Sequence, residues 1–84
     1  MSDKQIIATL NRLIKQLDEH DRLGEIEDTN QGFYSDLGFN SLSLVELCFL
    51  CEEEYNITID DDDVNDFRQV KDLVNTIKNS LDND

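Results

Sequence analysis

Few residues of this chain could take part in catalysis. A serine hydrolase needs a base beside its nucleophile, and His20 is the single histidine of a sequence that has no Gly-x-Ser-x-Gly turn. His20 follows an expected helix, and a single histidine near the C-terminus of a helix is usually a solvated residue that the helix dipole favours. We therefore predict neither a catalytic residue nor a metal ligand at this position.

A second candidate for chemistry is the Cys-x-x-Cys pair formed by Cys48 and Cys51. This spacing serves redox and zinc sites, but here it falls inside an expected apolar helix beside glutamates, surroundings that raise the pKa of a thiol. A zinc site would need two more ligands, and the sequence has none at a suitable position. We interpret the pair as buried structural thiols. Because residues 1–22 are mixed in charge and periodic, we expect no secretory signal, and free thiols then indicate a reducing, cytoplasmic location.

A third candidate is the run of four aspartates, Asp60–Asp63. A calcium loop that started at Asp60 would need glycine at its sixth position and glutamate at its twelfth, and the chain has Asn65 and Lys71 there. No dedicated metal site is predicted. A cation-responsive domain, in which divalent ions relieve repulsion among these carboxylates, stays open as an alternative.

The fourth candidate is Ser41, which stands at the expected start of the second helix, after Gly38. The first-turn N–H groups of a helix are unpaired, and its dipole favours a phosphate on a hydroxyl there. The simplest reading of Ser41 by itself is a capping residue. Asn40 and Ser43 are equally suitable caps, and Ser43 with Glu46 fits a capping box.

The spacing of apolar residues predicts the elements that must position these groups. Residues 3–19 and 70–81 carry apolar stripes at helical spacing, and a short helical turn is expected around Val64 and Phe67. The helix after Ser41 is apolar on more than one face, which predicts that it is partly buried and partly a contact surface. We expect an all-α fold: a small four-helix bundle of three longer helices and one short helix.

Residues 20–40 show no sustained period and are expected to form a long loop between the first two helices, pinned to the core by Ile26, Phe33, Tyr34, Leu37 and Phe39. A chain of 84 residues suffices for one core, so residues 1–84 are expected to form a single domain.

The distribution of charge separates the middle of the chain from its ends. The sequence has 7 Lys+Arg and 20 Asp+Glu, a formal net charge of −13, and residues 23–67 contain 13 acidic and no basic residues. Such a surface repels phosphates, so no nucleic-acid partner is expected. The longest apolar run, Leu47–Cys51, is far shorter than the roughly 20 residues of a membrane span. The uncompensated acidic segment predicts a docking surface for basic partner proteins.

Linked segments of the chain resemble the acyl carrier protein family: Asp36-Leu37-Gly38-x-x-Ser41-Leu42, Val45-Glu46-Leu47, Glu52-Glu53-Glu54-Tyr55-x-Ile57-x-Ile59, and Val70-x-Asp72-Leu73-Val74 with Ile77. The resemblance covers residues 36–77 closely and the first helix loosely. It implies the same small helical bundle. It also implies that Ser41 receives a phosphopantetheine arm from coenzyme A, attached by a separate magnesium-dependent phosphopantetheinyl transferase.

The resemblance further implies a non-catalytic carrier, whose arm bears acyl groups as thioesters between enzymes of fatty-acid, polyketide or a related specialised pathway. The helix after the serine is the recognition helix of the family. The residues that would meet basic patches on the transferase and on acyl-loading and acyl-processing enzymes are Glu46, Glu53 and Glu54, with Leu42 and Phe49 adding apolar contact. The carrier is expected to be a monomer.

Two positions depart from the family pattern. Typical members have aspartate before the modified serine and many have aspartate two residues after it, whereas this chain has Asn40 and Ser43. The departures favour a specialised pathway over a housekeeping one, and the spacing from Gly38 favours Ser41 over Ser43 as the modified residue. The alternative function is an unmodified acidic docking or regulatory module that binds basic partners through Glu46 and residues 52–54.

Overall fold

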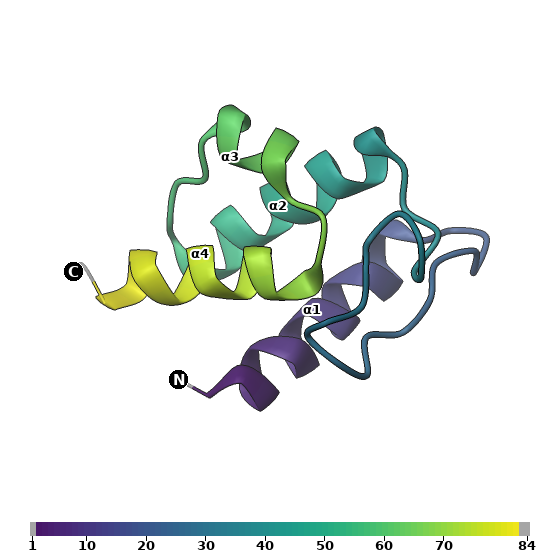
Figure 1. Ribbon diagram of the computed structural model, residues 1–84, viewed down its shortest axis with the longest axis horizontal. Helices are drawn as coiled ribbons and strands as arrows, with labels where there is room; N and C mark the ends of the chain where they lie inside the picture. The colour runs from purple at the N-terminus through teal and green to yellow at the C-terminus, as the bar shows by residue number, and fades with distance from the viewer. Residues whose placement is uncertain (1, 83–84) are drawn as a thin grey trace.

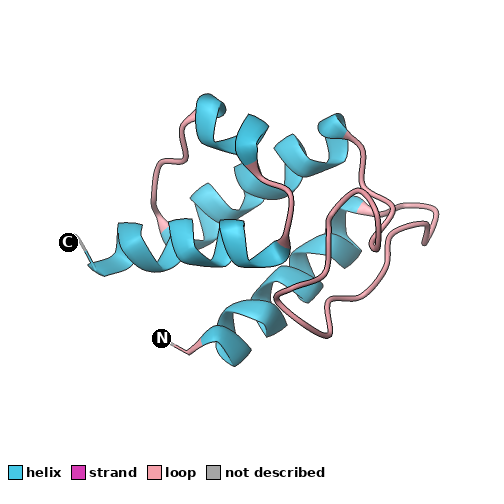
Figure 2. Ribbon diagram, viewed as in Figure 1, coloured by secondary structure: helices cyan, strands magenta, loops and turns pink. Residues whose placement is uncertain are grey.

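The computed structural model describes residues 2–82, and within that range it contains four α-helices and no β-strand (Figure 1, Figure 2). The helices are α1 (Asp3–Leu17), α2 (Ser41–Tyr55), α3 (Asp61–Asp66) and α4 (Val70–Asp82). The prediction of an all-α bundle with three longer helices and one short helix is confirmed. Met1, Asn83 and Asp84, which belong to the predicted 1–84 domain, lie outside the described residues.

Helix α1 is fixed at both ends by side chains. The Ser2 Oγ accepts a hydrogen bond from the Gln5 N–H at 3.3 Å, and the Gln5 side chain accepts one from the Ser2 N–H at 3.0 Å, which is a complete capping box. The helix ends two residues before the predicted residue 19, because the Asp18 carboxylate accepts the N–H groups of Arg22 and Leu23 and starts the loop. Its buried face consists of Ile6, Leu10, Leu13 and Ile14.

Helix α1 packs against α2 and α4, and α3 packs against α2 (Figure 1). The buried side chains of α2 and α4 complete the core, and they are Leu44, Leu47, Cys48, Cys51, Val70, Leu73, Val74 and Ile77. The first turn of α1 and the last turns of α4 lie at one end of the bundle, where the Lys78 Nζ is 2.9 Å from the Asp3 Oδ1. No helix in the described part of the chain is long and apolar enough to cross a membrane.

Helix α4 begins without a Ser or Thr cap. Instead the Asp72 carboxylate, in its first turn, accepts the N–H groups of Arg68 and Gln69, each at 2.9 Å. The loop between α1 and α2 runs to this same point. The Phe33 N–H donates to the Arg68 carbonyl and the Val70 N–H donates to the Gln31 carbonyl, both at 2.9 Å. The long loop is therefore tied to the start of α4 by backbone hydrogen bonds.

The loop is anchored by apolar side chains, with one exception to the prediction. Ile26, Phe33, Leu37 and Phe39 are buried as expected, whereas Tyr34 is 41% exposed. The prediction for Tyr34 is wrong because the Asp36 and Leu37 N–H groups both bond the Gly32 carbonyl and close a turn. This turn directs Phe33 and Leu37 into the core and leaves Tyr34 on its outer side.

Candidate functional site

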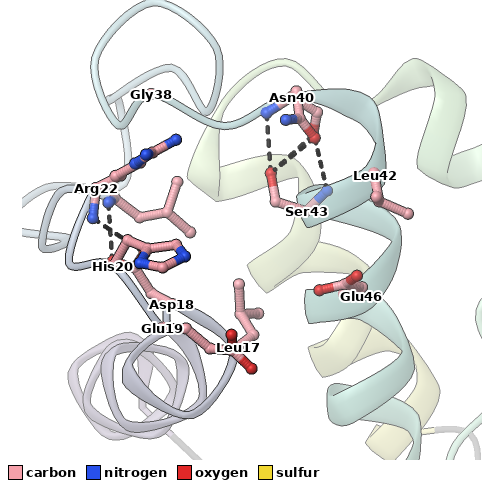
Figure 3. Close-up of a pocket in the computed structure, with 11 residues that line it drawn as sticks. Leu17, Asp18, Glu19, His20, Arg22, Gly38, Asn40, Leu42, Ser43 and Glu46 are labelled. Atoms are coloured by element: carbon pink, nitrogen blue, oxygen red, sulfur yellow. Dashed lines mark hydrogen bonds between the residues drawn. The ribbon is translucent and has the colours of Figure 1, made fainter.

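The start of α2 is closed by a capping box between Asn40 and Ser43 (Figure 3). The Asn40 Oδ1 accepts from the Ser43 N–H at 2.9 Å, and the Ser43 Oγ accepts from the Asn40 N–H at 2.9 Å. The predicted capping box of Ser43 with Glu46 is wrong, because Ser43 lies in the first turn of the helix. Asn40 has the extended backbone of a cap residue (φ −115°, ψ 178°).

The capping box gives the two neighbouring serines different surroundings. The Ser43 hydroxyl is also within 3.0 Å of the Asn40 carbonyl oxygen and 3.2 Å of its Oδ1, so its donor and acceptor are both used inside the cap. Ser41 is the first residue of the helix and is exposed, and its hydroxyl takes part in none of the hydrogen bonds found among residues 2–82. The Ser41 oxygen is therefore exposed and not engaged in the cap, whereas the Ser43 oxygen is engaged in it.

The segment before Ser41 is held from both sides. Phe39 is buried, its ring centroid lies 5.2 Å from that of Phe33 in an edge-to-face arrangement, and its N–H donates to the Phe33 carbonyl at 2.9 Å. Gly38 has a φ of +77°, a left-handed conformation that glycine adopts at no steric cost. These two residues turn the chain from the loop into α2 and fix where Ser41 stands.

The first turn of α2 has the properties of an anion site. The N–H groups of Ser41 and Leu42 belong to the first turn, where a helix has no carbonyl to pair them. No acidic side chain lies in this turn, so the positive end of the dipole is not already compensated. A phosphate on the Ser41 oxygen would fit this environment.

The outer face of α2 combines exposed apolar and acidic side chains. Leu42 is 66%, Val45 48% and Phe49 61% exposed, and Glu46 and Glu53 are exposed beside them. Three- and four-residue spacing places these side chains on one side of the helix. The structure thus brings four predicted docking residues together and adds Val45. The three-residue spacing of Val45 from Leu42 could have placed Val45 on this side of the helix from the sequence alone. Its exposure could not be read from the sequence.

Glu54 lies apart from this outer face. Its Oε1 is 2.9 Å from the Arg12 Nη2 of α1, because one residue along a helix turns the side chain by about 100°. The pairing partly offsets the charge of Glu54, so the prediction that groups it with Glu46 and Glu53 does not match its position. Arg12 and Glu54 are 42 positions apart in the chain, and no sequence pattern indicates their contact.

A hollow of about 400 Å³ lies beside the start of α2, between this helix and the segment that follows α1 (Figure 3). Leu17, His20 and Arg22 line one side, and Asn40, Leu42, Ser43 and Glu46 line the other. His20 is exposed, as predicted. The position of His20 and Arg22 opposite the start of α2 was not indicated by the sequence, since it depends on how the loop folds.

The thiols of Cys48 and Cys51 lie on the face of α2 that packs into the core. Cys48 is 2% and Cys51 0% exposed, and neither is in a disulfide. Burial, with a smaller contribution from Glu52, raises the pKa of Cys48 to about 12, and burial also raises the pKa of Cys51. The interpretation as buried structural thiols is confirmed, and a protonated buried thiol is a poor nucleophile and a poor metal ligand.

Asp60–Asp63 lie at and after the cap of α3, and the Asp60 side chain makes no capping hydrogen bond. In residues 2–82, no group of three or more His, Cys, Asp or Glu side chains is arranged to hold a metal ion.

Comparison with known proteins identifies relatives of the chain. Residues 5–77 match the family model described as "Phosphopantetheine attachment site". The chain is 45% identical over 47 residues to an acyl carrier protein of Nitratidesulfovibrio vulgaris (strain DP4), a match that covers 56% of this chain and 62% of that protein, less than two thirds of its length. It is 40% identical over 72 residues to an acyl carrier protein of Zymomonas mobilis subsp. mobilis (strain ATCC 31821 / ZM4 / CP4), covering 82% and 90%.

The fold also matches a solved structure. The crystal structure of an acyl carrier protein from Thermotoga maritima superposes with a TM-score of 0.84 at 28% sequence identity, covering 95% of this chain and 91% of that chain.

Proposed function

The chain belongs to the acyl carrier protein family, and we propose that it is a non-catalytic carrier that holds acyl groups on a phosphopantetheine arm at Ser41. Phosphopantetheine, covalently attached, is the prosthetic group of this family. When bound, it supplies a thiol on which acyl groups are held as thioesters.

The observation that supports Ser41 as the attachment site most directly is the difference in hydrogen bonding between the Ser41 and Ser43 hydroxyls. The Ser43 hydroxyl is used in the capping box, whereas the Ser41 hydroxyl is exposed and has no partner in the described residues. A group that must be modified by another protein has to be reachable, and its modification must not unfold the helix that presents it. Of the two hydroxyls, Ser41 satisfies both conditions.

The attachment is a displacement at phosphorus. The Ser41 Oγ forms a bond to the phosphorus of coenzyme A that bears the pantetheine. The bond from this phosphorus to the oxygen of the departing 3′,5′-adenosine bisphosphate breaks, and the hydroxyl proton goes to a base of the transferase. The unpaired N–H groups and the dipole of the first turn then stabilise the phosphodiester left on the chain.

The outer face of α2 (Leu42, Val45, Glu46, Phe49 and Glu53) is the proposed docking surface. Its partners are the phosphopantetheinyl transferase and acyl-loading and acyl-processing enzymes with basic patches. Long-range attraction steers such enzymes to the carrier, and each exposed ion pair contributes only about 0–1 kcal/mol, so the complexes also release. Glu54 contributes less, because Arg12 already offsets its charge.

The departures at Asn40 and Ser43 have a structural role that bears on the pathway. Both positions, where typical members have aspartates, form the neutral capping box of α2. Asparagine caps a helix about as well as aspartate, so the helix start is kept while two carboxylates are lost from the surface around Ser41. A transferase that binds this carrier must do without them, which favours a specialised fatty-acid, polyketide or related pathway.

Intact mass spectrometry tests the proposal. Wild type, Ser41→Ala and the matched control Ser43→Ala are incubated with coenzyme A, magnesium and a broad-specificity transferase. We expect the mass of one phosphopantetheine to be added to wild type and to Ser43→Ala, and none to Ser41→Ala. No gain in wild type, or a gain that survives Ser41→Ala, would contradict the proposal and favour an unmodified docking module.

A further inference from the structure

Two basic side chains lie across a hollow from the helix end that presents Ser41. His20 and Arg22 line the hollow of about 400 Å³ on the side of the segment that follows α1, opposite the first turn of α2 (Figure 3). Ser41 itself belongs to residues 23–67, which contain no Lys or Arg. A cation for an anionic group on Ser41 therefore has to come from another segment, and the fold brings Arg22 and His20 to this place.

Backbone contacts hold Arg22 beside the segment that leads into α2. The Asp18 carboxylate accepts the Arg22 N–H at 3.0 Å and so fixes the turn after α1. Two residues later, the Gly24 N–H donates to the Leu37 carbonyl at 2.9 Å. The Arg22 carbonyl oxygen is 3.5 Å from the position that a Cβ on Gly38 would take, so these two residues also pack together. The position of Arg22 relative to the start of α2 is thus set by the backbone.

The guanidinium of Arg22 is available to a ligand, unlike those of the other two arginines. The Arg12 Nη2 is 2.9 Å from the Glu54 Oε1, and the Arg68 Nη1 donates to two backbone carbonyls at 2.8 and 3.0 Å. Arg22 is exposed, and within residues 2–82 its side chain makes no hydrogen bond and no ion pair. In Figure 3 this side chain extends from the segment after α1 toward the start of α2.

The two neutral residues of the capping box leave this guanidinium without a partner on α2. Asn40 and Ser43 both line the hollow, at the positions where typical or many members of the family have aspartate. A carboxylate at either position would attract Arg22 across the hollow. The asparagine and the serine cap the helix without supplying that negative charge, so Arg22 can pair with a different anion.

The hollow also has acidic neighbours, which limit what the two cations can attract. Asp18, Glu19 and Glu46 line it, and Asp21 belongs to the same segment after α1. Among the described residues, none of these carboxylates forms an ion pair with either cation. They oppose the binding of a free anion from solution. An anion that is tethered beside the hollow is present at a high effective concentration, so even a weak attraction holds it.

We propose that Arg22, supported by His20 in its charged form, is the cationic seat of the phosphodiester that links the arm to Ser41, an inference that rests on the proposed function. The unpaired N–H groups of the first turn approach this anion from the helix, and Arg22 and His20 approach it from the segment after α1. The two side chains thereby hold the root of the arm on the side of α2 that faces this segment. They also offset part of the charge that a partner enzyme encounters there.

The first test compares the full chain with and without the arm. Intact mass shows whether the arm is attached, with Ser41→Ala as the control. In ¹⁵N-labelled protein, we expect attachment to shift the Nε–H signal of Arg22 and to slow its exchange with water, while the signals of Arg12 and Arg68 stay unchanged. Asn40→Asp keeps a helix cap but supplies a competing carboxylate, so it should reduce the response of Arg22.

The phosphorus signal of the arm tests the role of His20. A phosphodiester has no second proton to lose, so its ³¹P signal has no titration of its own between about pH 5 and 8, where an imidazole changes charge. Carboxylates ordinarily titrate below this range, and His20 is the single histidine of the chain. We expect a step in the ³¹P signal over this range in wild type and none in His20→Gln.

A matched pair of variants links the seat to stability. Arg22→Gln and Lys15→Gln each remove one exposed positive charge, but Lys15 does not line the hollow. The quantity measured is the melting midpoint of the protein with the arm minus that of the unmodified protein. This difference should fall by about 1–8 °C in Arg22→Gln, the shift expected for loss of one exposed ion pair in a domain of this size. It should stay at the wild-type value in Lys15→Gln.

The outcomes separate this proposal from the carrier function. If the arm is attached but the Arg22 signal does not respond, or if both variants change the melting difference equally, Arg22 is not the seat and the carrier function stands. A ³¹P signal without a step in wild type would remove His20 from the seat. Absence of the arm in wild type would overturn both proposals.

Discussion

Replacing Ser43 with alanine should destabilise the folded protein, whereas the same replacement at Ser41 should not. The Ser43 Oγ accepts the Asn40 N–H at 2.9 Å and lies 3.0 Å from the Asn40 carbonyl, and both contacts are lost in Ser43→Ala. The N–H of residue 43 keeps its bond to the Asn40 Oδ1, so only half of the capping box disappears. In Ser41→Ala no hydrogen bond among the described residues is lost.

The expected size of the effect follows from these bonds. Loss of a capping interaction costs about 1 kcal/mol, and the better helix propensity of alanine returns up to about 0.5 kcal/mol. Ser43→Ala should therefore lower the free energy of unfolding by about 0.5–1 kcal/mol. For a domain of this size, that corresponds to a melting midpoint lower by roughly 2–8 °C. Ser41→Ala should leave the midpoint unchanged or raise it slightly, since an exposed substitution usually changes stability by no more than about 0.5 kcal/mol.

The assay is thermal unfolding of the unmodified proteins, followed by circular dichroism at one pH and ionic strength. Asn40→Ala is a positive control, because it removes the Oδ1 acceptor of the Ser43 N–H and should cost about 1 kcal/mol. The double variant of residues 40 and 43 should lose less than the sum of the two, since both bonds belong to one capping box. If Ser41→Ala lowered the midpoint as far as Ser43→Ala, the Ser41 hydroxyl would be part of the cap, and the separation of capping from attachment would fail.

Two further predictions concern the solution conditions. Raising sodium chloride from 0.1 to 1 M shortens the Debye length from about 10 to 3 Å. Because this screens the repulsion among the 13 acidic residues in 23–67, the melting midpoint should rise by several degrees. A constant or falling midpoint would contradict this account. Burial raises the pKa of Cys48 from an ordinary value near 9 to about 12, so the unfolded chain loses this proton first. The free energy of unfolding is therefore unaffected by this thiol below pH 9. As the pH rises toward 12, ionisation of Cys48 in the unfolded chain lowers the free energy of unfolding by up to about 4 kcal/mol. Urea unfolding from pH 7 to 10.5 should thus show a steeper loss for wild type than for Cys48→Ala, and equal slopes would refute the assignment.

The sequence predicted the parts of the structure that depend on neighbours along the chain. Apolar residues at helical spacing indicated α1, α2 and α4, because a helix repeats every 3.6 residues and must bury one stripe. The excess of apolar residues in α2 indicated a second, exposed face, and Leu42 and Phe49 are on it. The burial of Cys48 and Cys51 followed from the same pattern.

The start of α2 shows where local patterns become ambiguous. Asn40, Ser41 and Ser43 are all suitable cap residues, and Ser43 with Glu46 fits a capping box, so the sequence allows the helix to start at different residues. The packing of Phe39 on Phe33 decides between them, because a buried Phe39 ends the loop immediately before Asn40. This contact also leaves the hydroxyl of Ser41 free, while that of Ser43 is used in the cap.

The sequence by itself determined that the chain is an acidic helical bundle and that a serine stands at the start of its second helix, since periodicity, charge and caps are properties of short segments. Only the tertiary structure decided that Tyr34 points outward, that Glu54 pairs with Arg12, and that Arg22 lies opposite the start of α2. Each of these facts depends on residues distant in the chain or on how a loop closes. Such contacts are chosen by the packing of whole elements, which no short segment encodes.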